Sequence, residues 1–324
     1  MPPMDFDALS LTELIAVQEQ VSRSLAQRFQ HERALVFVDV VGSTPYFERY
    51  GDAAGRVLIQ RSQNLLYGVL DTSLGRVVDT AGDGVFLCFE TAQAAADTMV
   101  AYQRAIDSQN RAFPPEQQLQ VRAGLHWGPV LTDGQLVTGD SVNVAARVAG
   151  RAGGFEILVS DSAVEALGPR NLRRLRRLQD VTLKGVSSPV RLWEMTWLDT
   201  KRFPVRVTVR ETKEEHILPM QSVLRFGRLG VWEGEIANEV VLRLPDPQAS
   251  RKISRWHFEL HREDDGYVLL QRSRSPVVVD GEPVPQGGKA RIEPFSAVAI
   301  ADVMTLDFSP RYEAAEGLET IGPA

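Results

Sequence analysis

The stretches LVFVDVVGST at residues 35–44 and VVDTAGDGVFLCF at residues 77–89 decide the fold of the first half of this chain. Each carries an apolar run typical of a buried strand, and Asp39 and Asp83 lie beside these runs. A glycine follows each aspartate within three residues, so the chain can turn sharply there. Two carboxylates at the ends of adjacent strands suit Mg²⁺, which one or two carboxylates and substrate phosphates usually hold. Taken singly, either loop is equally consistent with a plain strand-to-turn junction.

The composition excludes several classes of protein. The 324 residues suggest about two domains, and a hydrophobic content of 44% is enough for ordinary cores. The net charge of −6 gives no global basic field for nucleic acid, and the single cysteine, Cys88, cannot form an internal disulfide. No apolar run approaches the roughly 20 residues that span a bilayer. The acidic start MPPMDFDALS does not resemble a signal peptide, so we expect a cytoplasmic protein without a membrane span.

The patterning predicts four segments. In residues 1–30, Ser10 and Glu13 predict a capping box at the start of a helix over residues 9–30. Its narrow apolar stripe is open to two interpretations, which are packing on the following domain and a dimerising or signal-coupling role. Residues 31–199 alternate strands and helices, which predicts an α+β fold with helices on a sheet. Residues 200–310 have short strands with close turn signals, typical of an all-β sandwich. Residues 311–324 are predicted to form a flexible tail.

The ranges predicted for the first domain follow the apolar pattern. Strands are expected at residues 34–41, 75–79, 84–89, 120–126, 155–159 and 189–197, and helices at 44–72, 91–110, 140–150 and 161–167.

Three side chains beyond the aspartates carry chemistry that suits a nucleotide. Asn143 and Arg147, in GDSVNVAARVAG, are four residues apart and therefore share one helix face. An asparagine can bond a ribose oxygen, and an arginine is a permanent cation suited to phosphate. Lys184, in VTLKGVSSPVRLWEM, adjoins a glycine at a strand end, where a lysine is commonly a solvated hairpin residue.

Together these pieces resemble the class III nucleotidyl cyclase catalytic domain, the family of adenylyl and guanylyl cyclases. Six motifs match in the family's order over about residues 31–198: FVDVVGST, TAGDGVFLCF, VRAGLHWGPV, GDSVNVAARV, FEILVSD and LKGVSSPVRLWEM. The resemblance implies a ferredoxin-like α/β sandwich. It also implies a homodimer with active sites at the subunit interface, where ATP is converted to 3′,5′-cyclic AMP and pyrophosphate.

The resemblance also assigns roles to individual residues. Two Mg²⁺ or Mn²⁺ ions per site would be bound by Asp39, Val40 and Asp83. The triphosphate would be cradled by the backbone from Val40 to Thr44, which includes the nucleotide-binding residues Gly42, Ser43 and Thr44. The partner subunit would supply the catalytic residues Asn143, Arg147 and Lys184, the first orienting the ribose and the other two stabilising charge on the transferring phosphate.

Two positions depart from the adenylyl cyclase pattern. The places where such enzymes read adenine, usually with a lysine and with an aspartate or threonine, hold Asp79 and Leu136 here. Asp79 is similar to the glutamate that guanylyl cyclases use, and the Leu136 side chain forms no hydrogen bond. Because an apolar wall discriminates poorly between bases, GTP or a pyrimidine triphosphate is an alternative to ATP.

The segment at about residues 203–309 resembles the forkhead-associated (FHA) domain, a β-sandwich that binds phosphothreonine peptides. The matching stretches are LRFGRLG, ASRKISRWHFEL and SPVVVDGEPV. The implied phosphopeptide-binding residues are Arg228, Ser254, Arg255, His257 and Ser275, where Ser275 or a neighbour replaces the family's usual asparagine. Arginine and hydroxyl groups form a sound phosphate site. One alternative is an FHA fold that docks without phosphopeptide, and another is a catalytically silent phosphoprotein-docking scaffold.

Overall fold

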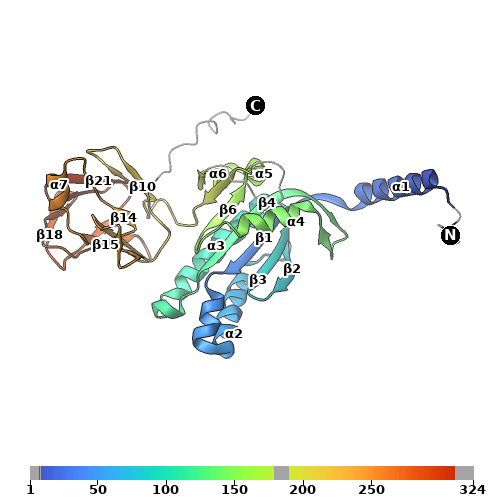
Figure 1. Cartoon of the computed structure of the whole chain (residues 1–324), viewed down its shortest axis with the longest axis horizontal. Coiled ribbons are helices and arrows are strands. Elements are labelled where there is room, and N and C mark those ends of the chain that lie inside the picture. The colour runs from blue at the N-terminus through green and yellow to red at the C-terminus, as the bar shows by residue number, and fades with distance from the viewer. Residues whose placement is uncertain (1–6, 8, 179–189, 311–324) are drawn as a thin grey trace. The chain divides into compact units, whose positions relative to one another are not determined.

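The structure is a computed structural model that describes residue 7 and residues 9–178 and 190–310; residues 1–6, 8, 179–189 and 311–324 lie outside the description. The chain divides into two compact units at the boundary between Trp197 and Leu198 (Figure 1). Each unit has a buried core of its own. No helix in the described ranges is long and apolar enough to cross a membrane.

The first unit is a mixed sheet with helices on both faces. Its helices are α1 (Leu11–Phe29), α2 (Ser43–Val69), α3 (Ala92–Asn110), α4 (Asp140–Ala149), α5 (Asp161–Glu165) and α6 (Pro169–Leu172), with a 3₁₀ turn at Pro115–Gln117. Its strands are β1 (Gln30–Val40), β2 (Gly75–Ala81), β3 (Gly84–Phe89), β4 (Val121–Thr132), β5 (Val137–Thr138), β6 (Ile157–Ser160), β7 (Leu175–Arg177) and β8 (Leu192–Met195). The strand order is β2-β3-β1-β4-β6-β8-β7, and β5 pairs with β4.

The four strands β2-β3-β1-β4 form the βαββαβ arrangement of a ferredoxin-like core. Helix α2 connects β1 to β2, and α3 connects β3 to β4. Strand β1 lies in the centre and pairs antiparallel with both β3 and β4. The predicted ferredoxin-like α/β sandwich is therefore confirmed.

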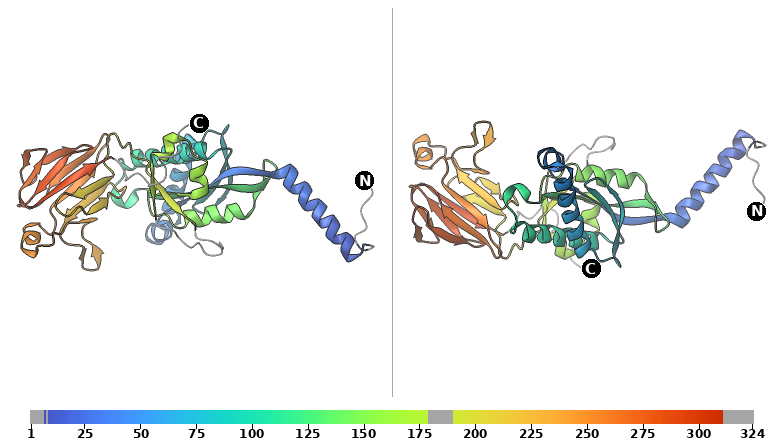
Figure 2. Two further views of the ribbon diagram at one scale, coloured as in Figure 1. Left: turned by 90° about the horizontal axis from the view of Figure 1, so that it is seen from above. Right: turned by 90° about the horizontal axis from the view of Figure 1, so that it is seen from below.

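Alternation along β1 separates the two faces of this sheet. Leu35 lies on the face that α4 covers, in one apolar cluster with Cys88 and Ala145. Ala34 and Val36 are fully buried on the opposite face, where α2 and α3 pack (Figure 2). Asp39 lies four residues after Leu35 on the same strand. Because side chains alternate between the two faces, the Asp39 side chain also belongs to the α4 face.

Helix α1 begins with the predicted capping box, which is confirmed. The Ser10 hydroxyl accepts a hydrogen bond from Glu13 N, and Ser10 N donates to the Glu13 carboxylate at 2.8 Å. No residue of α1 is buried, and five apolar side chains of its stripe are exposed: Leu11, Leu14, Ile15, Val21 and Leu25. The part of the chain that the structure describes thus leaves the stripe uncovered, contrary to the interpretation that α1 packs on the following domain.

The second unit is built almost entirely of strands. These are β9 (Arg206–Val209), β10 (Glu215–Ile217), β11 (Val223–Gly227), β12 (Val231–Trp232), β13 (Glu235–Ile236), β14 (Val240–Val241), β15 (Phe258–Arg262), β16 (Tyr267–Gln271), β17 (Val277–Val279), β18 (Glu282–Val284), β19 (Lys289–Ile292), β20 (Ala297–Ile300) and β21 (Met304–Ser309). A short helix, α7 (Pro247–Lys252), precedes β15.

Two sheets of the second unit pack face to face. Their orders are β10-β9-β21-β20-β17-β18 and β14-β11-β15-β16-β19, and β12 and β13 form a separate hairpin. Phe226 of one sheet meets Phe308 of the other with 6.4 Å between ring centroids, and both are buried. The unit is therefore a β-sandwich whose connecting loops lie outside the core.

Candidate functional site

Asp39 and Asp83 lie at the same end of the first sheet. Strands β1 and β3 are antiparallel with Val38 opposite Val85. Asp39, one residue beyond Val38, is therefore next to the turn that holds Asp83 just before β3. The structure thus brings the two predicted metal-binding side chains to neighbouring strand ends, where both are half-buried.

Asp39 has a cationic partner that sequence reasoning missed. Arg122 of β4 lies directly opposite Asp39, and its Nε donates to Asp39 Oδ2 at 2.9 Å. Its Nη2 donates to the same oxygen. The ion pair fixes the orientation of the carboxylate, and no described residue bonds its other oxygen, Oδ1. The only signal in the sequence is a charged residue set between apolar ones in VRAGL.

Asp83 is tied to the start of α2. The Ser43 hydroxyl donates to Asp83 Oδ2, and Ser43 is the first residue of α2. The preceding residue, Gly42, has φ of 75°, a left-handed conformation that side-chain-bearing residues rarely adopt. The first N–H groups of a helix lack intrahelical acceptors and attract anions. The predicted phosphate cradle through Thr44 therefore coincides with a helix N-terminus beside both aspartates.

The donor set at this end of the sheet fits Mg²⁺ or Mn²⁺. Asp39 and Asp83 offer carboxylate oxygens, and Val40 at the end of β1 offers a backbone carbonyl. Mg²⁺ usually keeps waters and binds substrate phosphates beside one or two carboxylates. Within the described ranges, no group of three or more His, Cys, Asp or Glu side chains could hold a metal. An ion bound here would thus take its remaining ligands from a phosphate and from water.

Asn143 and Arg147 lie on α4, one helical turn apart. Asn143 is exposed, while Arg147 Nη1 is buried and has no hydrogen-bond partner among the residues that the structure describes. Leaving a buried charged donor unpaired is costly, so an anionic ligand at Arg147 would be favoured. No hydrogen bond or ion pair among the described residues joins either side chain to the aspartates. The third predicted catalytic residue, Lys184, lies outside the described residues.

The two predicted base-reading residues face solvent in the single chain. Asp79 of β2 is exposed, and its Oδ1 accepts a hydrogen bond from Thr80 N at 2.8 Å. Leu136 lies in the turn between β4 and β5 with 62% of its surface exposed. Its backbone N–H donates to Asp133 Oδ1 at 2.9 Å. Both positions are therefore open to a ligand or to a second chain.

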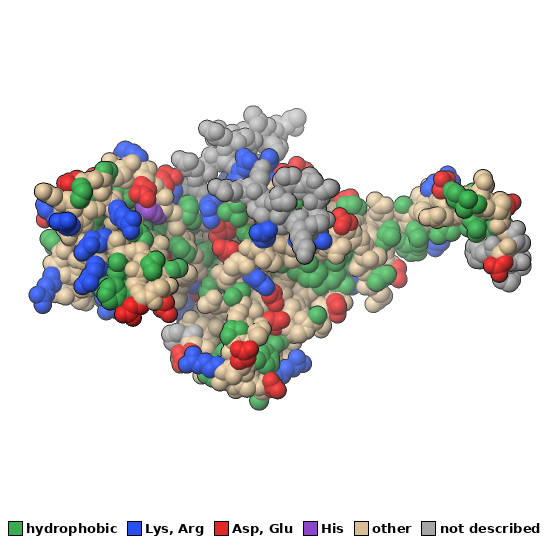
Figure 3. All heavy atoms as spheres, viewed as in Figure 1, with side chains coloured by type: hydrophobic (Ala, Val, Ile, Leu, Met, Phe, Trp, Pro, Cys, Tyr) green, Lys and Arg blue, Asp and Glu red, His purple; other side chains and the backbone are tan. Residues whose placement is uncertain are grey.

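Loops of the second unit bring three of its predicted site residues together. Ser254 Oγ and Ser275 Oγ are 3.1 Å apart, and Arg228 N donates to Ser254 O at 3.0 Å. The side chains of Arg228 and Arg255 are exposed. Figure 3 shows several basic side chains on the visible face of this unit. This loop cluster offers hydroxyls and cations, which suit an anionic group.

His257 is buried beneath this cluster. Its Nδ1 accepts a hydrogen bond from Ser254 N at 3.1 Å, and none of its surface is exposed. Burial lowers the pKa of His257 to about 4, so the ring is neutral near pH 7. The histidine thus holds the Ser254 loop in place from within the fold.

Asn238 joins the same loops and was not found by sequence reasoning. Its Nδ2 donates to Leu229 O at 2.7 Å and to Arg255 O at 2.8 Å. At Gly227 the loops are so close that a Cβ would lie 2.2 Å from Arg255 O. An asparagine in a turn carries no signal that distinguishes this role from an ordinary turn position.

The family described as "Adenylate and Guanylate cyclase catalytic domain" matches residues 14–198. The chain belongs to this family. The resemblance of the first domain to class III cyclases is thereby confirmed, and the first unit carries a nucleotidyl cyclase catalytic domain. The aspartates at the strand ends and the α4 residues Asn143 and Arg147 all lie inside the matched range.

Several cyclases are similar to this chain. The protein named "Putative adenylate cyclase 3" of Rhizobium meliloti (strain 1021) is 26% identical over 212 residues, which cover 65% of this chain and 35% of that protein. An adenylate cyclase of Glutamicibacter nicotianae is 31% identical over 116 residues, 36% of this chain and 27% of the relative. The chain therefore spans about a third of these relatives' length. The crystal structure of an adenylate/guanylate cyclase/hydrolase from Silicibacter pomeroyi is 26% identical with a TM-score of 0.47, covering 51% of this chain and 96% of that one.

Proposed function

We propose that this protein is an adenylate cyclase that converts ATP to 3′,5′-cyclic AMP and pyrophosphate at sites shared by two copies of the chain. One observation carries the proposal. Within one cyclase domain, Asp39 and Asp83 lie together, while a buried N–H of Arg147 has no partner in the described ranges and Arg147 makes no described contact with either aspartate. A second copy would bring the two halves together. The names of the relatives favour ATP as the substrate.

The first half of the site binds the triphosphate. Asp39, Asp83 and the carbonyl of Val40 would hold the two divalent ions, which when bound supply charge neutralisation and lower the pKa of the attacking hydroxyl. The N–H groups at the start of α2 would donate to the phosphates, since this helix N-terminus lies beside Asp83, to which the Ser43 hydroxyl donates. Arg122 positions Asp39 through its ion pair.

The second half of the site acts on the ribose and on the developing charge. Asn143 orients the 3′ oxygen in line with the α-phosphorus, so that the new O–P bond forms as the bond to pyrophosphate breaks and the proton of the 3′ hydroxyl passes to solvent. Arg147 and Lys184 face the phosphate and stabilise the charge that grows in the transition state. The uncovered apolar stripe of α1 supports a homodimer, because a second copy could bury it.

The base is tested by product analysis. Purified protein is incubated with Mn²⁺ and ATP, GTP, CTP or UTP, and the products are identified by mass spectrometry, with Asp83→Asn as the inactive control. We expect 3′,5′-cyclic AMP as the main product. Preferred conversion of GTP or a pyrimidine triphosphate would contradict the ATP assignment. Of these two alternatives, GTP is the one that the Asp79 carboxylate would favour. If a folded dimer turns over none of the four nucleotides, the result would instead support a catalytically silent scaffold. A cytoplasmic location stays a prediction.

A second proposal concerns the β-sandwich, for which we infer an FHA-like phosphothreonine site. It is supported by the convergence of Ser254, Ser275 and the Arg228 loop above the buried His257. Arg228 and Ser254 would bind the phosphate, while Arg255 and Ser275 would contact the peptide. A phosphothreonine-containing protein would then be the partner that this unit recruits.

Peptide arrays test this second proposal. A degenerate phosphothreonine peptide library should bind the full-length protein, while the unphosphorylated library should not. Arg228→Ala should weaken binding at least about tenfold, because a charge-assisted phosphate contact is lost. Lys289→Ala, an exposed cation on β19, is the matched control and should bind normally. Equal binding of both libraries would leave docking without phosphopeptide as the function of this unit.

A further inference from the structure

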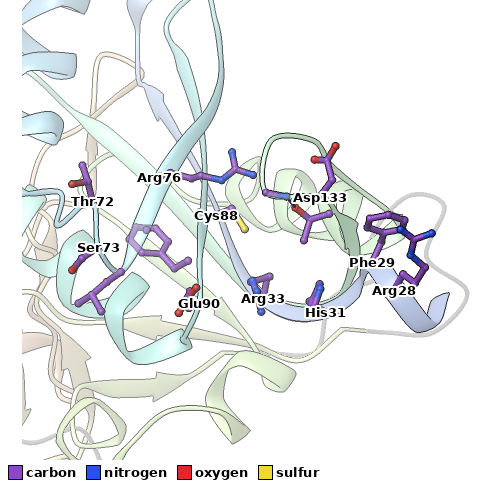
Figure 4. Close-up of a pocket in the computed structure, with 15 residues that line it drawn as sticks. Arg28, Phe29, His31, Arg33, Thr72, Ser73, Arg76, Cys88, Glu90 and Asp133 are labelled. Carbon is purple, nitrogen blue, oxygen red and sulfur yellow. Dashed lines mark hydrogen bonds between the residues drawn. The ribbon is translucent and has the colours of Figure 1, made fainter. Parts of the chain in front are cut away.

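A cavity of about 440 Å³ lies at the other end of the first sheet from Asp39 (Figure 4). It is lined by the end of α1, the outer ends of β1, β2 and β3, and the turn after β4. Arg33 of the cavity precedes Asp39 by six residues on β1, so their Cα atoms are about 20 Å apart along the strand. The cavity is therefore separate from the two aspartates.

Strand register places the cavity's basic side chains on one face. Cys88 pairs with Arg76 of β2 and with Leu35 of β1. Arg33 is two residues from Leu35, so Arg33, Cys88 and Arg76 project from the same side of the sheet. Figure 4 shows the arginines and the cysteine around one space, with Arg28 and Phe29 of α1 at its border. Three guanidinium groups from three elements thus line one cavity.

None of these three arginines forms an ion pair with a carboxylate of the described residues. Arg122 and Arg225, by contrast, form ion pairs with carboxylates. Within the described ranges no carboxylate forms an ion pair with Arg28, Arg33 or Arg76, and Arg33 Nη1 donates only to the neighbouring carbonyl of Glu32.

Two acids also line the cavity and do not neutralise it. Asp133 accepts hydrogen bonds from the N–H groups of Gln135 and Leu136 on a single oxygen, and these bonds, with a smaller contribution from the charge of Arg76, lower the pKa of its carboxyl. Glu90 is exposed at the rim. Three arginines against these two carboxylates leave a net positive charge before any contribution from His31.

We propose that this cavity binds a small phosphorylated molecule of about nucleotide size. Its phosphate would lie on Arg33 and Arg76, because the guanidinium fork matches phosphate oxygens. An apolar ring would lie against Phe29, and the hydroxyl of Thr132 offers a further hydrogen bond. The volume is within the range of small-molecule sites. This assignment goes beyond the cyclase proposal and does not depend on it.

The test measures binding without turnover. Adenosine 5′-monophosphate and, separately, inorganic pyrophosphate are titrated calorimetrically into the full-length protein in the presence of EDTA. We expect the native protein to bind the monophosphate. The double variant Arg33→Gln/Arg76→Gln should bind it at least about tenfold more weakly. Arg56→Gln, an exposed arginine of α2, is the matched control. Tighter binding of the monophosphate than of pyrophosphate would support the apolar contact.

Further variants separate this cavity from the other two candidate sites. Binding should survive Arg147→Gln and Arg228→Gln, which alter the cyclase and loop-cluster sites. Three results would overturn the proposal. They are loss of monophosphate binding in Arg147→Gln or Arg228→Gln, native binding in the double variant Arg33→Gln/Arg76→Gln, and no binding of the monophosphate by the native protein.

Discussion

Arg122 lies directly opposite Asp39 in the β1–β4 ladder, and its guanidinium donates two hydrogen bonds to one oxygen of the Asp39 carboxylate. The side chains are 33% and 28% exposed, so the pair is only partly shielded from water. Its contribution to the free energy of unfolding should be about 1 kcal/mol or less. Its main effect is to hold Asp39 in one orientation and to leave the second oxygen open to a ligand.

Removing this arginine should therefore affect catalysis more than stability. In Arg122→Gln we expect kcat to fall roughly ten- to a hundredfold, because a small displacement of a metal-binding carboxylate misaligns the reacting groups. Steady-state kinetics with Mn²⁺ and chemical denaturation measure the two effects. Arg56→Gln is the charge-matched control and should change neither. An unaltered kcat in Arg122→Gln would show that the ion pair does not position Asp39 for catalysis.

A shared site predicts complementation between two inactive proteins. Asp39→Ala removes a metal-binding group and Arg147→Ala removes a charge-stabilising group, so each homodimer should be inactive. After mixing and subunit exchange, half of the dimers are mixed and each has one intact site, so activity should return to about a quarter of the native value. Two copies of the same variant mixed together provide the control. If the mixed proteins are folded and exchange subunits but stay inactive, the two halves of the active site act within one chain.

Asp79 should influence the choice of base. A carboxylate accepts hydrogen bonds from the N–H groups of guanine, whereas a lysine donates to the acceptor nitrogens of adenine. Asp79→Lys should raise the ratio of kcat/KM for ATP to that for GTP by about tenfold or more. The exposed position tolerates the longer side chain. Asp79→Asn removes the charge without adding a cation and serves for comparison; an identical ratio in all three proteins would mean that Asp79 does not contact the base.

The half-buried His126 and the buried His257 predict a loss of stability in mild acid. Burial lowers the pKa of His126 and of His257 to about 4 from an unfolded value near 6.5. Between these values the unfolded chain binds protons that the folded chain does not, so stability is full above about pH 6.5 and falls as the pH drops toward 4.

The slope can reach about 1.4 kcal/mol per pH unit for each histidine. Denaturation of each unit as a function of pH measures it, because His126 lies in the cyclase unit and His257 in the sandwich. His126→Gln should flatten the curve of the first unit and leave that of the second unit unchanged. If that variant keeps the native slope in the first unit, His126 is not the group that titrates.

Asn238 should matter for both the stability and the binding of the second unit. Asn238→Ala leaves the carbonyls of Leu229 and Arg255 without their donor, which should lower the free energy of unfolding by roughly 2 kcal/mol. Because these residues flank the Arg228 and Ser254 loops, phosphothreonine-peptide affinity should fall as well. Asn64→Ala on the exposed face of α2 is the control. Native affinity in Asn238→Ala would show that the loops keep their positions without the amide.

Local patterns predicted most elements well. The apolar run at residues 84–89 has the bounds of β3, and the Ser10–Glu13 pair marks the start of α1. Strand β1 begins at Gln30, four residues before the predicted start, because its first residues are polar and mostly exposed. Their strand conformation comes from pairing with the end of β4, which no apolar pattern reveals. The two-residue strand β5 was missed for the same reason, because it too is held by pairing with the end of β4.

By itself the sequence determined the family, the order of the elements and the residue types available for chemistry, since apolar periodicity, caps and motif order are local properties of the chain. Only the tertiary structure decided which side chains meet. Arg122 reaches Asp39, and Arg33 and Arg76 border one cavity with Cys88, through strand register between segments far apart in the chain. Register and loop packing depend on the whole core, so neighbouring residues do not reveal these contacts.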